Sequence, residues 1–593
     1  MRVADYIATT LETHGVRAAF LLSGGGMMHL IDAVGRLTKL RYYCHHHEQA
    51  CAMAADGYAR QTGGLGVVYA TSGPGATNLL TGLVGAWQDS TPLLFLTGQS
   101  KSSQTIHGSG ITGLRQFGTF EVDIVPIVRS VTKYAAVIEK PSQARYHLER
   151  ALRAATTGRP GPVLLDVPLD VQGAVVDPAR LEGCDESPPT PPRLSAEDFR
   201  AIWSALRSAR RPLILAGYGV RCAGVVSQFR ESIARWRLPV VTTQLAKDIL
   251  PFDHELFIGH PGVRGDRAGN FAVQNADVIV SLGCSLHAQT VGYDAEQFAP
   301  RARKFMVDPD DAILQRASVG VERRIQADIA DFLLQSREIG AVAGDPAWQS
   351  RCSEWKRRYD VRREPHPCGG PGDPINYYEL ADRLSDSLSG NETIITDCGS
   401  AWYVLGQGLR IKGQQRFLSS GAMGTMGFTL PACTGAAVAA PERMIVGVTG
   451  DGSLQTNVHE LAVHKHHQLN IKLFVVDNDG YLSIRNTQRQ YFRGFLVGSS
   501  VESGVWLPPI GAIAAAYGLP FVDCPDRQSL AEAIRRTLAT PGPVICRVAA
   551  MPDQPLIPSV ASRKLADGRM VSKPLHDMTP FLDEHEMAEQ MCW

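Results

Sequence analysis

The chain has 593 residues, more than the ~250–300 at which a single hydrophobic core stops growing, so it should hold several domains. Its 59 basic residues balance its 59 acidic residues, which gives no reason to expect nucleic acid or an anionic membrane as a partner. Twelve cysteines are scattered without CxxC pairs, so the sequence indicates neither a zinc ribbon nor a disulfide framework.

The beginning of the chain and its apolar runs favour a cytoplasmic enzyme. Residues 1–6 carry charges where a signal peptide would need an apolar core. No apolar run approaches the ~20 residues of a membrane-spanning helix. We therefore expect a soluble cytoplasmic protein that acts on small molecules.

Two proline-rich seams, residues 187–192 and 365–372, can continue neither a helix nor a central strand. Outside the seams, short β-branched runs alternate with helical patterns, which is typical of parallel sheets covered by helices. The predicted fold class is α/β, with three consecutive parallel-sheet domains. The expected limits are 1–185, 195–355 and 373–550, followed by a C-terminal tail or lid over 551–593.

The first block contains two glycine turns and an acidic helix start. Ser23-Gly24-Gly25-Gly26 and Thr71-Ser72-Gly73-Pro74-Gly75 each follow an apolar run, and Asn78 comes just after the second turn. As isolated glycine turns, both are weak signals. Between them, Glu48 stands where a strand gives way to an alanine-rich helix. Taken alone, Glu48 is an N-terminal carboxylate that the helix dipole favours.

Three consecutive histidines, His45, His46 and His47, precede Glu48. Neighbouring residues on an extended strand point to opposite faces, so we do not expect the three rings to converge on one metal ion. His47 is more plausible as a polar group of an active site. Farther along the chain, His464, His466 and His467 lie in a helical stretch and are expected to be solvated.

The third block carries the most informative pair of motifs. Gly450-Asp451-Gly452-Ser453 follows one buried apolar run, and Asn478 caps another, 471–476. If these parallel strand ends are neighbours, the Asp451 carboxylate and the Asn478 amide oxygen come together. Such hard oxygen ligands suit Mg²⁺, and the glycines leave backbone N–H groups open to a phosphate. The pair therefore predicts a magnesium–diphosphate site.

Together with His47-Glu48-Gln49 and Gly57-Tyr58-Ala59-Arg60, these motifs make the chain resemble the thiamine-diphosphate (ThDP) enzymes, in their acetolactate-synthase-like branch. The resemblance extends from Val3 to about Pro580. It implies pyrimidine-binding, central Rossmann-like and diphosphate-binding domains, with ThDP and Mg²⁺ as cofactors. It also implies a homodimer or homotetramer whose active sites form between chains.

The resemblance assigns roles to residues. Asp451, Asn478 and the Gly480 carbonyl would hold Mg²⁺. Glu48 would act against the aminopyrimidine ring, whose imino form removes the proton from thiazolium C2, and Met426 would lie between the two cofactor rings rather than serve as an ordinary core methionine. Further cofactor-binding candidates are Ser72, Asn78, Gly399, Ser400, Gly424, Gly450, Gly452, Ser453 and Tyr481, and substrate candidates are Gly25, Gly26, Gln116 and Phe120.

The chain departs from acetolactate synthases at two places. Phe120 stands where those enzymes carry a glutamine that bonds reaction intermediates, and Gln116 is close in sequence but out of register. Ser285 and Gln289 stand at the two arginine positions that engage FAD in the flavin-carrying synthases; the second arginine also meets the acceptor carboxylate. We therefore expect no tightly bound FAD, although Arg264 or Arg267 could substitute.

We therefore interpret the chain as a ThDP- and Mg²⁺-dependent carboligase that decarboxylates a 2-oxoacid, with pyruvate as first candidate, and adds the acyl unit to a carbonyl acceptor. A keto-sugar is a candidate acceptor, because residues 293–299 and 566–570 resemble relatives associated with modified sugars. The alternatives are an acetolactate synthase and a simple decarboxylase or lyase. A nucleotide- or NAD-linked protein is a rival of another class, but residues 215–220 lack a full GxGxxG.

Overall fold

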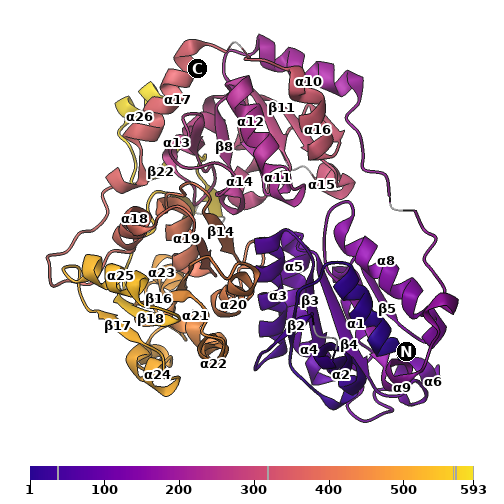
Figure 1. Cartoon of the computed structure of the whole chain (residues 1–593). Helices are drawn as coiled ribbons and strands as arrows, with labels where there is room; N and C mark the ends of the chain where they lie inside the picture. Colours follow the sequence, from indigo (N-terminus) through magenta and orange to yellow (C-terminus); the bar gives the residue numbers. More distant parts are fainter. Residues whose placement is uncertain are drawn as a thin grey trace.

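The computed structural model of the chain describes residues 1–36, 39–187, 189–316, 319–342, 344–564, 567 and 570–591 (Figure 1). They form three six-stranded sheets, and in each sheet all strands run parallel. The predicted α/β class with three parallel-sheet domains is therefore confirmed. Pro188, in the first proline-rich seam, lies outside the described residues, and the block limits given above stay predictions.

The first sheet has the strand order β2-β1-β3-β4-β6-β5. Its inner strands are buried on both faces, which explains their continuous apolar sequences. Helices α1, α2 and α8 cover one face, and α3 and α5 cover the other. The bounds are α1 Val3–Thr13, β1 Ala18–Leu21, α2 Met28–Arg36, β2 Arg41–Cys44, α3 Glu48–Thr62, β3 Gly66–Ala70, α5 Leu80–Asp89, β4 Leu93–Gln99, β5 Tyr134–Val137, α8 Ala144–Thr156 and β6 Val163–Pro168.

The central sheet has the order β12-β11-β10-β7-β8-β9, so the chain adds strands on both sides of β7. Tryptophans fill the layers against it: Trp203 and Trp236 on one face, Trp355 on the other. The bounds are α10 Ala196–Ser208, β7 Pro212–Ala216, α12 Val226–Trp236, β8 Val240–Thr242, β9 Phe257–Gly259, α13 Arg267–Asn275, β10 Val278–Leu282, β11 Arg303–Asp308, β12 Arg323–Gln326, α16 Ile329–Gln335 and α17 Pro346–Arg358.

The third sheet has the order β14-β13-β15-β16-β18-β17. Helices α18, α19 and α25 cover one face, and α20 and α22 contribute to the cover of the other. The bounds are α18 Tyr377–Ser387, β13 Thr393–Thr396, α19 Gly399–Gly408, β14 Arg416–Ser419, α20 Thr429–Ala439, β15 Ile445–Gly450, α21 Asp451–Thr456, α22 Leu461–His466, β16 Ile471–Asp477, α23 Leu482–Tyr491, β17 Phe521–Cys524, α25 Leu530–Ala539 and β18 Val544–Ala549.

Helices α3 and α20 join the first sheet to the third, and Figure 1 shows them between the two. A Cβ at Gly57 would overlap the Ala432 carbonyl oxygen, and a Cβ at Gly435 would overlap the Ala54 carbonyl oxygen. The two helix backbones are therefore in direct contact. This contact explains why α3 is built from small residues, because a larger side chain at the crossing would separate the sheets.

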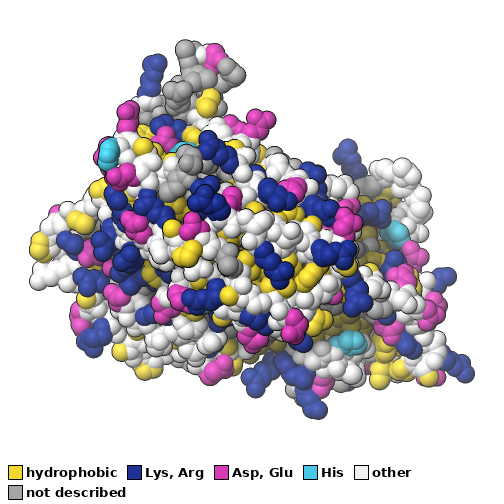
Figure 2. All heavy atoms as spheres, turned by 90° about the horizontal axis from the view of Figure 1, so that it is seen from above, with side chains coloured by type: hydrophobic (Ala, Val, Ile, Leu, Met, Phe, Trp, Pro, Cys, Tyr) yellow, Lys and Arg dark blue, Asp and Glu magenta, His cyan; other side chains and the backbone are white. Residues whose placement is uncertain are grey.

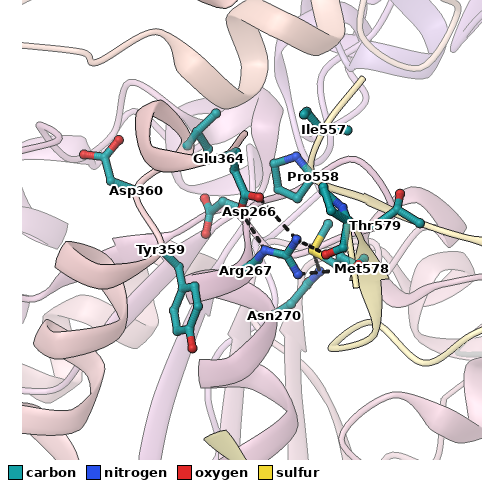
Figure 3. Close-up of polar contacts among 12 residues, drawn as sticks. Asp266, Arg267, Asn270, Tyr359, Asp360, Glu364, Ile557, Pro558, Met578 and Thr579 are labelled. Atoms are coloured by element: carbon teal, nitrogen blue, oxygen red, sulfur yellow. Dashed lines mark hydrogen bonds and ion pairs between the residues drawn. The ribbon is translucent and has the colours of Figure 1, made fainter. Parts of the chain in front are cut away.

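The C-terminal segment returns to the central sheet. Its strands β19 (Ser559–Val560) and β22 (Met578–Thr579) pair antiparallel, and α26 (Glu584–Gln590) follows. Asn270 on α13 donates to the Leu575 carbonyl at 2.8 Å, and Met578 is fully buried in the core beside that helix (Figure 3). The segment is thus fastened to the central domain. Ala566, Gly568 and Arg569, from the tail motif noted in the sequence, lie outside the described residues.

The surface agrees with the balanced charge. On the face shown in Figure 2, basic and acidic side chains are interspersed. In the described part of the chain, no helix is long and apolar enough to span a membrane.

Candidate active site

The ends of β15 and β16 bring the two oxygen-bearing residues of the third sheet together. The strands pair in parallel up to Gly450, which places Asp451 beside the residues that follow β16. Asp451 Oδ1 accepts the Gly452 N–H at 2.7 Å, and Oδ2 accepts the N–H groups of Asn478 at 3.1 Å and Gly480 at 2.9 Å. The carboxylate is thereby fixed against the turn that carries Asn478.

Among the described residues, the Asp451 carboxylate forms no ion pair, and Arg485 donates to the backbone carbonyl of Asn478 at 2.5 Å rather than to its side chain. The Asn478 side-chain oxygen is buried and has no hydrogen-bond partner among the described residues. Burial raises the pKa of Asp451 to about 6, although the N–H groups of Gly480 and Gly452 act to lower it. An unpaired buried acceptor costs about 1–3 kcal/mol, so it marks a place for a ligand. A carboxylate and a free amide oxygen side by side fit a hard cation such as Mg²⁺.

The Ser453 hydroxyl has hydrogen-bond partners within the protein that the sequence did not predict. Its hydroxyl donates to Asp397 Oδ2 at 2.5 Å and accepts the Gly427 N–H at 2.8 Å. Asp397 also accepts the Thr449 hydroxyl at 2.8 Å. The Ser453 hydroxyl therefore ties the segment ending at Gly427 to the sheet.

The remaining cofactor candidates of the third sheet border the same region. Gly399 opens α19 with a φ of +62°, a conformation that favours glycine. The Ser400 hydroxyl lies 3.2 Å from that of Ser483 on α23. A Cβ at Gly452 would overlap the ring of Tyr481, so this glycine lets Tyr481 pack against the Asp451 turn.

Met426 lies in the segment 421–427 between β14 and α20, and its side chain is half-buried. It is therefore not a core methionine, and it is available to a ligand. Gly424, two residues earlier, has a φ of +61° and open space around its Cα.

Glu48 is the first residue of α3 and is 6% exposed. Its Oε2 accepts the Asn78 side-chain amide at 2.9 Å, and among the described residues no other hydrogen bond reaches this carboxylate. A Cβ at Gly75 would lie 3.2 Å from Oε1. His47 caps the helix, because its Nδ1 accepts the Gln49 N–H at 3.1 Å.

The two glycine turns of the first block lie against each other. The Gly26 N–H donates to the Thr71 hydroxyl at 3.1 Å, and a Cβ at Gly26 would lie 2.6 Å from the Ser72 hydroxyl. Gln172 donates to the Gly26 carbonyl at 2.8 Å. Gly25 begins a short 3₁₀ helix and has open space around it. The turns therefore gather at the carboxyl ends of β1 and β3, near Glu48.

Phe120 lies in another loop and its backbone contacts the second glycine turn. Its carbonyl oxygen lies 2.4 Å from where a Cβ at Gly73 would be, and its φ is +56°. Its side chain is 71% exposed. Gln116 is exposed four residues earlier in the same loop, so Phe120 and not Gln116 is the residue held at the turn.

The structure assembles two half-sites on different sheets. Glu48 and Asn78 form one half, and Asp451 and Asn478 form the other. Within the described ranges, no hydrogen bond or ion pair connects a side chain of the first half to one of the second.

Sequence reasoning missed Glu460, a fully buried residue in the 3₁₀ helix that follows α21. Its Oε2 lies 2.5 Å from His45 Nδ1, and its Oε1 accepts the His46 N–H at 3.0 Å. Burial acts to raise the pKa of Glu460, but the bond and charge of His45, the N–H of His46 and the charge of His459 together outweigh it and leave the pKa below its usual value. Glu460 therefore fixes the strand end that precedes Glu48. The sequence signal that could have identified Glu460 is an acidic residue between the apolar residues Val458 and Leu461 in a stretch with a helical pattern.

The histidines have separate partners. His45 contacts Glu460, His47 caps α3, and the His46 ring lies 6.5 Å from that of His459. The expectation that His464 is solvated is wrong: it is 1% exposed and its Nε2 lies 3.0 Å from the Leu430 carbonyl oxygen. Burial lowers its pKa to about 4. His464 faces α20 because it lies one turn after the buried Leu461 on α22.

Comparison with known protein families identifies the three domains in order. "Thiamine pyrophosphate enzyme, N-terminal TPP binding domain" matches residues 1–116. The central domain of the same enzymes matches residues 199–335, and their C-terminal TPP binding domain matches residues 397–548.

Curated relatives match nearly the whole chain. The acetolactate synthase isozyme 1 large subunit of Escherichia coli K12 is 31% identical over 94% of this chain and 95% of its own length. The probable acetolactate synthase large subunit of Methanocaldococcus jannaschii is 32% identical over 90% of each chain. The chloroplastic acetolactate synthase of Arabidopsis thaliana is 30% identical over 94% of this chain and 83% of its own length.

The first prediction concerns Glu48. Glu48→Gln keeps the side-chain shape but removes the group that exchanges a proton. We expect H/D exchange at C2 of bound ThDP to slow by about 10²-fold or more, in the range usual for general acid–base groups. Exchange would be followed by proton NMR in protein that retains ThDP, and near-normal exchange would contradict the role.

The second prediction concerns Glu460 as a positioning residue. Glu460→Gln loses the charged bond to His45, so the Glu48 segment should shift and C2 exchange should slow by about tenfold, the equivalent of ~1.4 kcal/mol. Glu392→Gln is the matched control, because Glu392 is also buried but holds the loop 389–391 at the opposite end of the third sheet. Equal slowing in both variants would mean that Glu460 acts only through general stability.

Proposed function

We propose that this member of the acetolactate-synthase-like branch of the thiamine pyrophosphate enzymes decarboxylates a 2-oxoacid. It would then transfer the acyl unit to a carbonyl acceptor. The chain is a ThDP-dependent carboligase of this branch, and pyruvate is our proposed donor. The observation that carries the proposal is the unpaired buried oxygen of Asn478 beside the Asp451 carboxylate.

The bound ThDP supplies the electron sink that decarboxylation requires. Asp451, Asn478 and the Gly480 carbonyl would hold the Mg²⁺ that neutralises its diphosphate. Because Asp451 is already fixed by three N–H groups, this half-site is preorganised and needs little rearrangement to bind the metal.

Glu48 would hold and move the proton on the first half-site. Its Oε2 is taken by Asn78, which leaves Oε1, near Gly75, to face the cofactor. Glu48 is 6% exposed, so its carboxyl group would exchange a proton with a bound ligand rather than with bulk solvent.

Both departures from acetolactate synthases support an acceptor other than a second 2-oxoacid. Phe120, held at the Gly73 turn, offers an apolar ring where those enzymes offer an amide. Ser285 and Gln289 replace the arginines, so the carboxylate clamp of those enzymes is missing. We propose a neutral carbonyl group as the acceptor, with a keto-sugar as candidate. The rival is acetolactate synthesis, the activity in the names of the relatives.

We propose that active sites form between two copies of the chain. The half-sites lie on different sheets, and loops that contact them carry exposed aromatic side chains. Phe117 is 56% exposed in the loop that carries Phe120. Phe495 and Trp506 are 75% and 71% exposed in the segment that follows α23, whose Ser499 carbonyl accepts the Tyr481 N–H. Exposed apolar side chains of this size mark contact surfaces. A second copy would cover them and complete each site.

Product analysis tests the proposed reaction. Protein with ThDP, Mg²⁺ and pyruvate should release CO₂, and a panel of aldehydes and ketones should yield adducts detected by mass. Adducts with a non-acid carbonyl, formed faster than acetolactate, support the proposal. CO₂ release without any adduct would identify a simple decarboxylase instead.

Subunit mixing tests the assembly. Glu48→Gln and Asp451→Ala chains should each be inactive, but a mixed dimer has one site with both native residues. We expect recovery of activity after verified subunit exchange. A site built within one chain would show no recovery.

The residues at positions 285 and 289 lead to one prediction about FAD and one about the acceptor. Without arginines at 285 and 289, purified protein should show little visible flavin absorbance. Pyruvate alone should give little acetolactate, because a carboxylate without its guanidinium partner loses roughly 2–5 kcal/mol. Stoichiometric FAD would contradict the first expectation, and rapid acetolactate formation would contradict the second.

A further inference from the structure

Arg485, in the first turn of α23, is a buried cation bound to the backbone around the proposed metal site. Its residue is 3% exposed, and in the described part of the chain it forms no ion pair. Its guanidinium donates instead to four backbone carbonyl groups. Burying a charged group is costly unless its hydrogen bonds are satisfied, and here the backbone alone satisfies them.

The four carbonyl groups come from three separate segments of the third domain and its C-terminal continuation. Two of them belong to the loop 478–481, which carries the proposed magnesium ligands. Nη2 donates to the Asn478 carbonyl at 2.5 Å and to the Pro552 carbonyl at 2.9 Å, and Nη1 donates to the Ser499 carbonyl at 3.1 Å and to the Asp479 carbonyl. Arg485 thus fastens this loop to two other segments.

Arg485 and Asp451 bind opposite ends of one peptide unit of the loop. The Gly480 N–H donates to Asp451 Oδ2 at 2.9 Å. The Asp479 carbonyl, at the other end of the same peptide unit, accepts from Arg485. Both bonds involve a charged side chain, so they fix the plane of this peptide unit more firmly than bonds between neutral groups would.

The loop needs such support, because two of its residues have left-handed backbone conformations. Asp479 has a φ of +63° and Gly480 a φ of +106°. A non-glycine residue in this region is strained and keeps its conformation only when its surroundings hold it. At Gly480, a Cβ would lie 2.8 Å from the Ser499 carbonyl oxygen. That carbonyl accepts both the Tyr481 N–H at 3.0 Å and Arg485 Nη1, so Arg485 supports the next peptide unit as well.

We propose that Arg485 is a positioning residue of the magnesium site. By fixing the loop 478–481, it holds the Asn478 side-chain oxygen and the Gly480 carbonyl where both can bind one metal ion. A guanidinium has no acceptor atom and cannot bind the metal itself, so its effect passes through the loop. This inference rests on the proposed function, because it concerns the metal ion of the ThDP cofactor.

The charge of Arg485 and its positioning role predict opposite effects on metal binding. A guanidinium near the site repels Mg²⁺, so by charge alone its replacement with a neutral residue would strengthen binding. If Arg485 positions the oxygen ligands, its replacement weakens binding. Changing a group that orients metal ligands commonly costs about 10–100-fold in affinity. The sign of the change therefore separates the two effects.

Calorimetric titration of Mg²⁺ into metal-free protein saturated with ThDP tests the inference. Arg485→Lys keeps the positive charge, but its three donors and lack of a planar fork prevent it from binding all four carbonyl groups. We expect its Mg²⁺ affinity to fall by about tenfold or more. Arg485→Gln should also lose affinity, although it removes the repulsion. Thermal unfolding establishes that each variant is folded, and Arg485→Lys decides the outcome if Arg485→Gln does not fold.

Titration of Ca²⁺ in parallel distinguishes positioning from a general loss of stability. Mg²⁺ demands near-octahedral geometry, whereas Ca²⁺ accepts about six to eight oxygen ligands in flexible arrangements. A displaced oxygen should therefore reduce the Mg²⁺ affinity more than the Ca²⁺ affinity. The matched control is Arg489→Gln, one turn later on α23. The Arg489 side chain is 42% exposed and pairs with Asp553, so this variant should bind both ions as the native protein does.

The inference is overturned if the Arg485→Lys protein binds Mg²⁺ as tightly as the native protein or more tightly, or if both ions lose affinity equally. CO₂ release from pyruvate, measured on the native protein, tests the proposed function separately. Arg485-dependent Mg²⁺ binding without CO₂ release would contradict the proposed function alone. CO₂ release with a Mg²⁺ affinity that does not depend on Arg485 would contradict this inference alone.

Discussion

The backbone contact between α3 and α20 is the constraint on which the arrangement of the functional residues depends. Gly57 and Gly435 allow it, because any side chain at the crossing would overlap a carbonyl of the opposite helix. The contact brings the strand end before Glu48 to the helix that follows α21, where Glu460 accepts from His45 and His46. One glycine-mediated crossing therefore fixes how the first sheet stands against the third.

Buried polar groups with a structural role have partners inside the chain, whereas those proposed to bind a ligand do not. The buried structural groups are paired inside the chain: Arg267 with Glu364, and the His45 ring with the Glu460 carboxylate. At the proposed cofactor site the pairing is incomplete. Asn478 keeps an unbonded side-chain oxygen beside Asp451. Because an uncompensated buried polar group is costly, we propose that this is where the metal ion of the cofactor belongs.

Much of the fold was readable from local patterns. Continuous apolar runs predicted the buried parallel strands, and the three sheets confirm them. The neighbouring positions of Asp451 and Asn478 were predicted on the condition that their two strands lie side by side, and the parallel pairing of β15 with β16 meets that condition. Glu48 needed the family resemblance, since a carboxylate at a helix start has an ordinary structural explanation.

What the sequence determined by itself was therefore periodicity, strand ends and motif spacing, which act over short distances along the chain. Only the tertiary structure decided which distant groups neutralise each other. It assigned Glu460 to His45 across 415 positions, buried His464 against α20, and paired Arg267 with Glu364. These outcomes depend on how the helices and the C-terminal segment pack, and side-chain partners separated by hundreds of residues leave no local pattern.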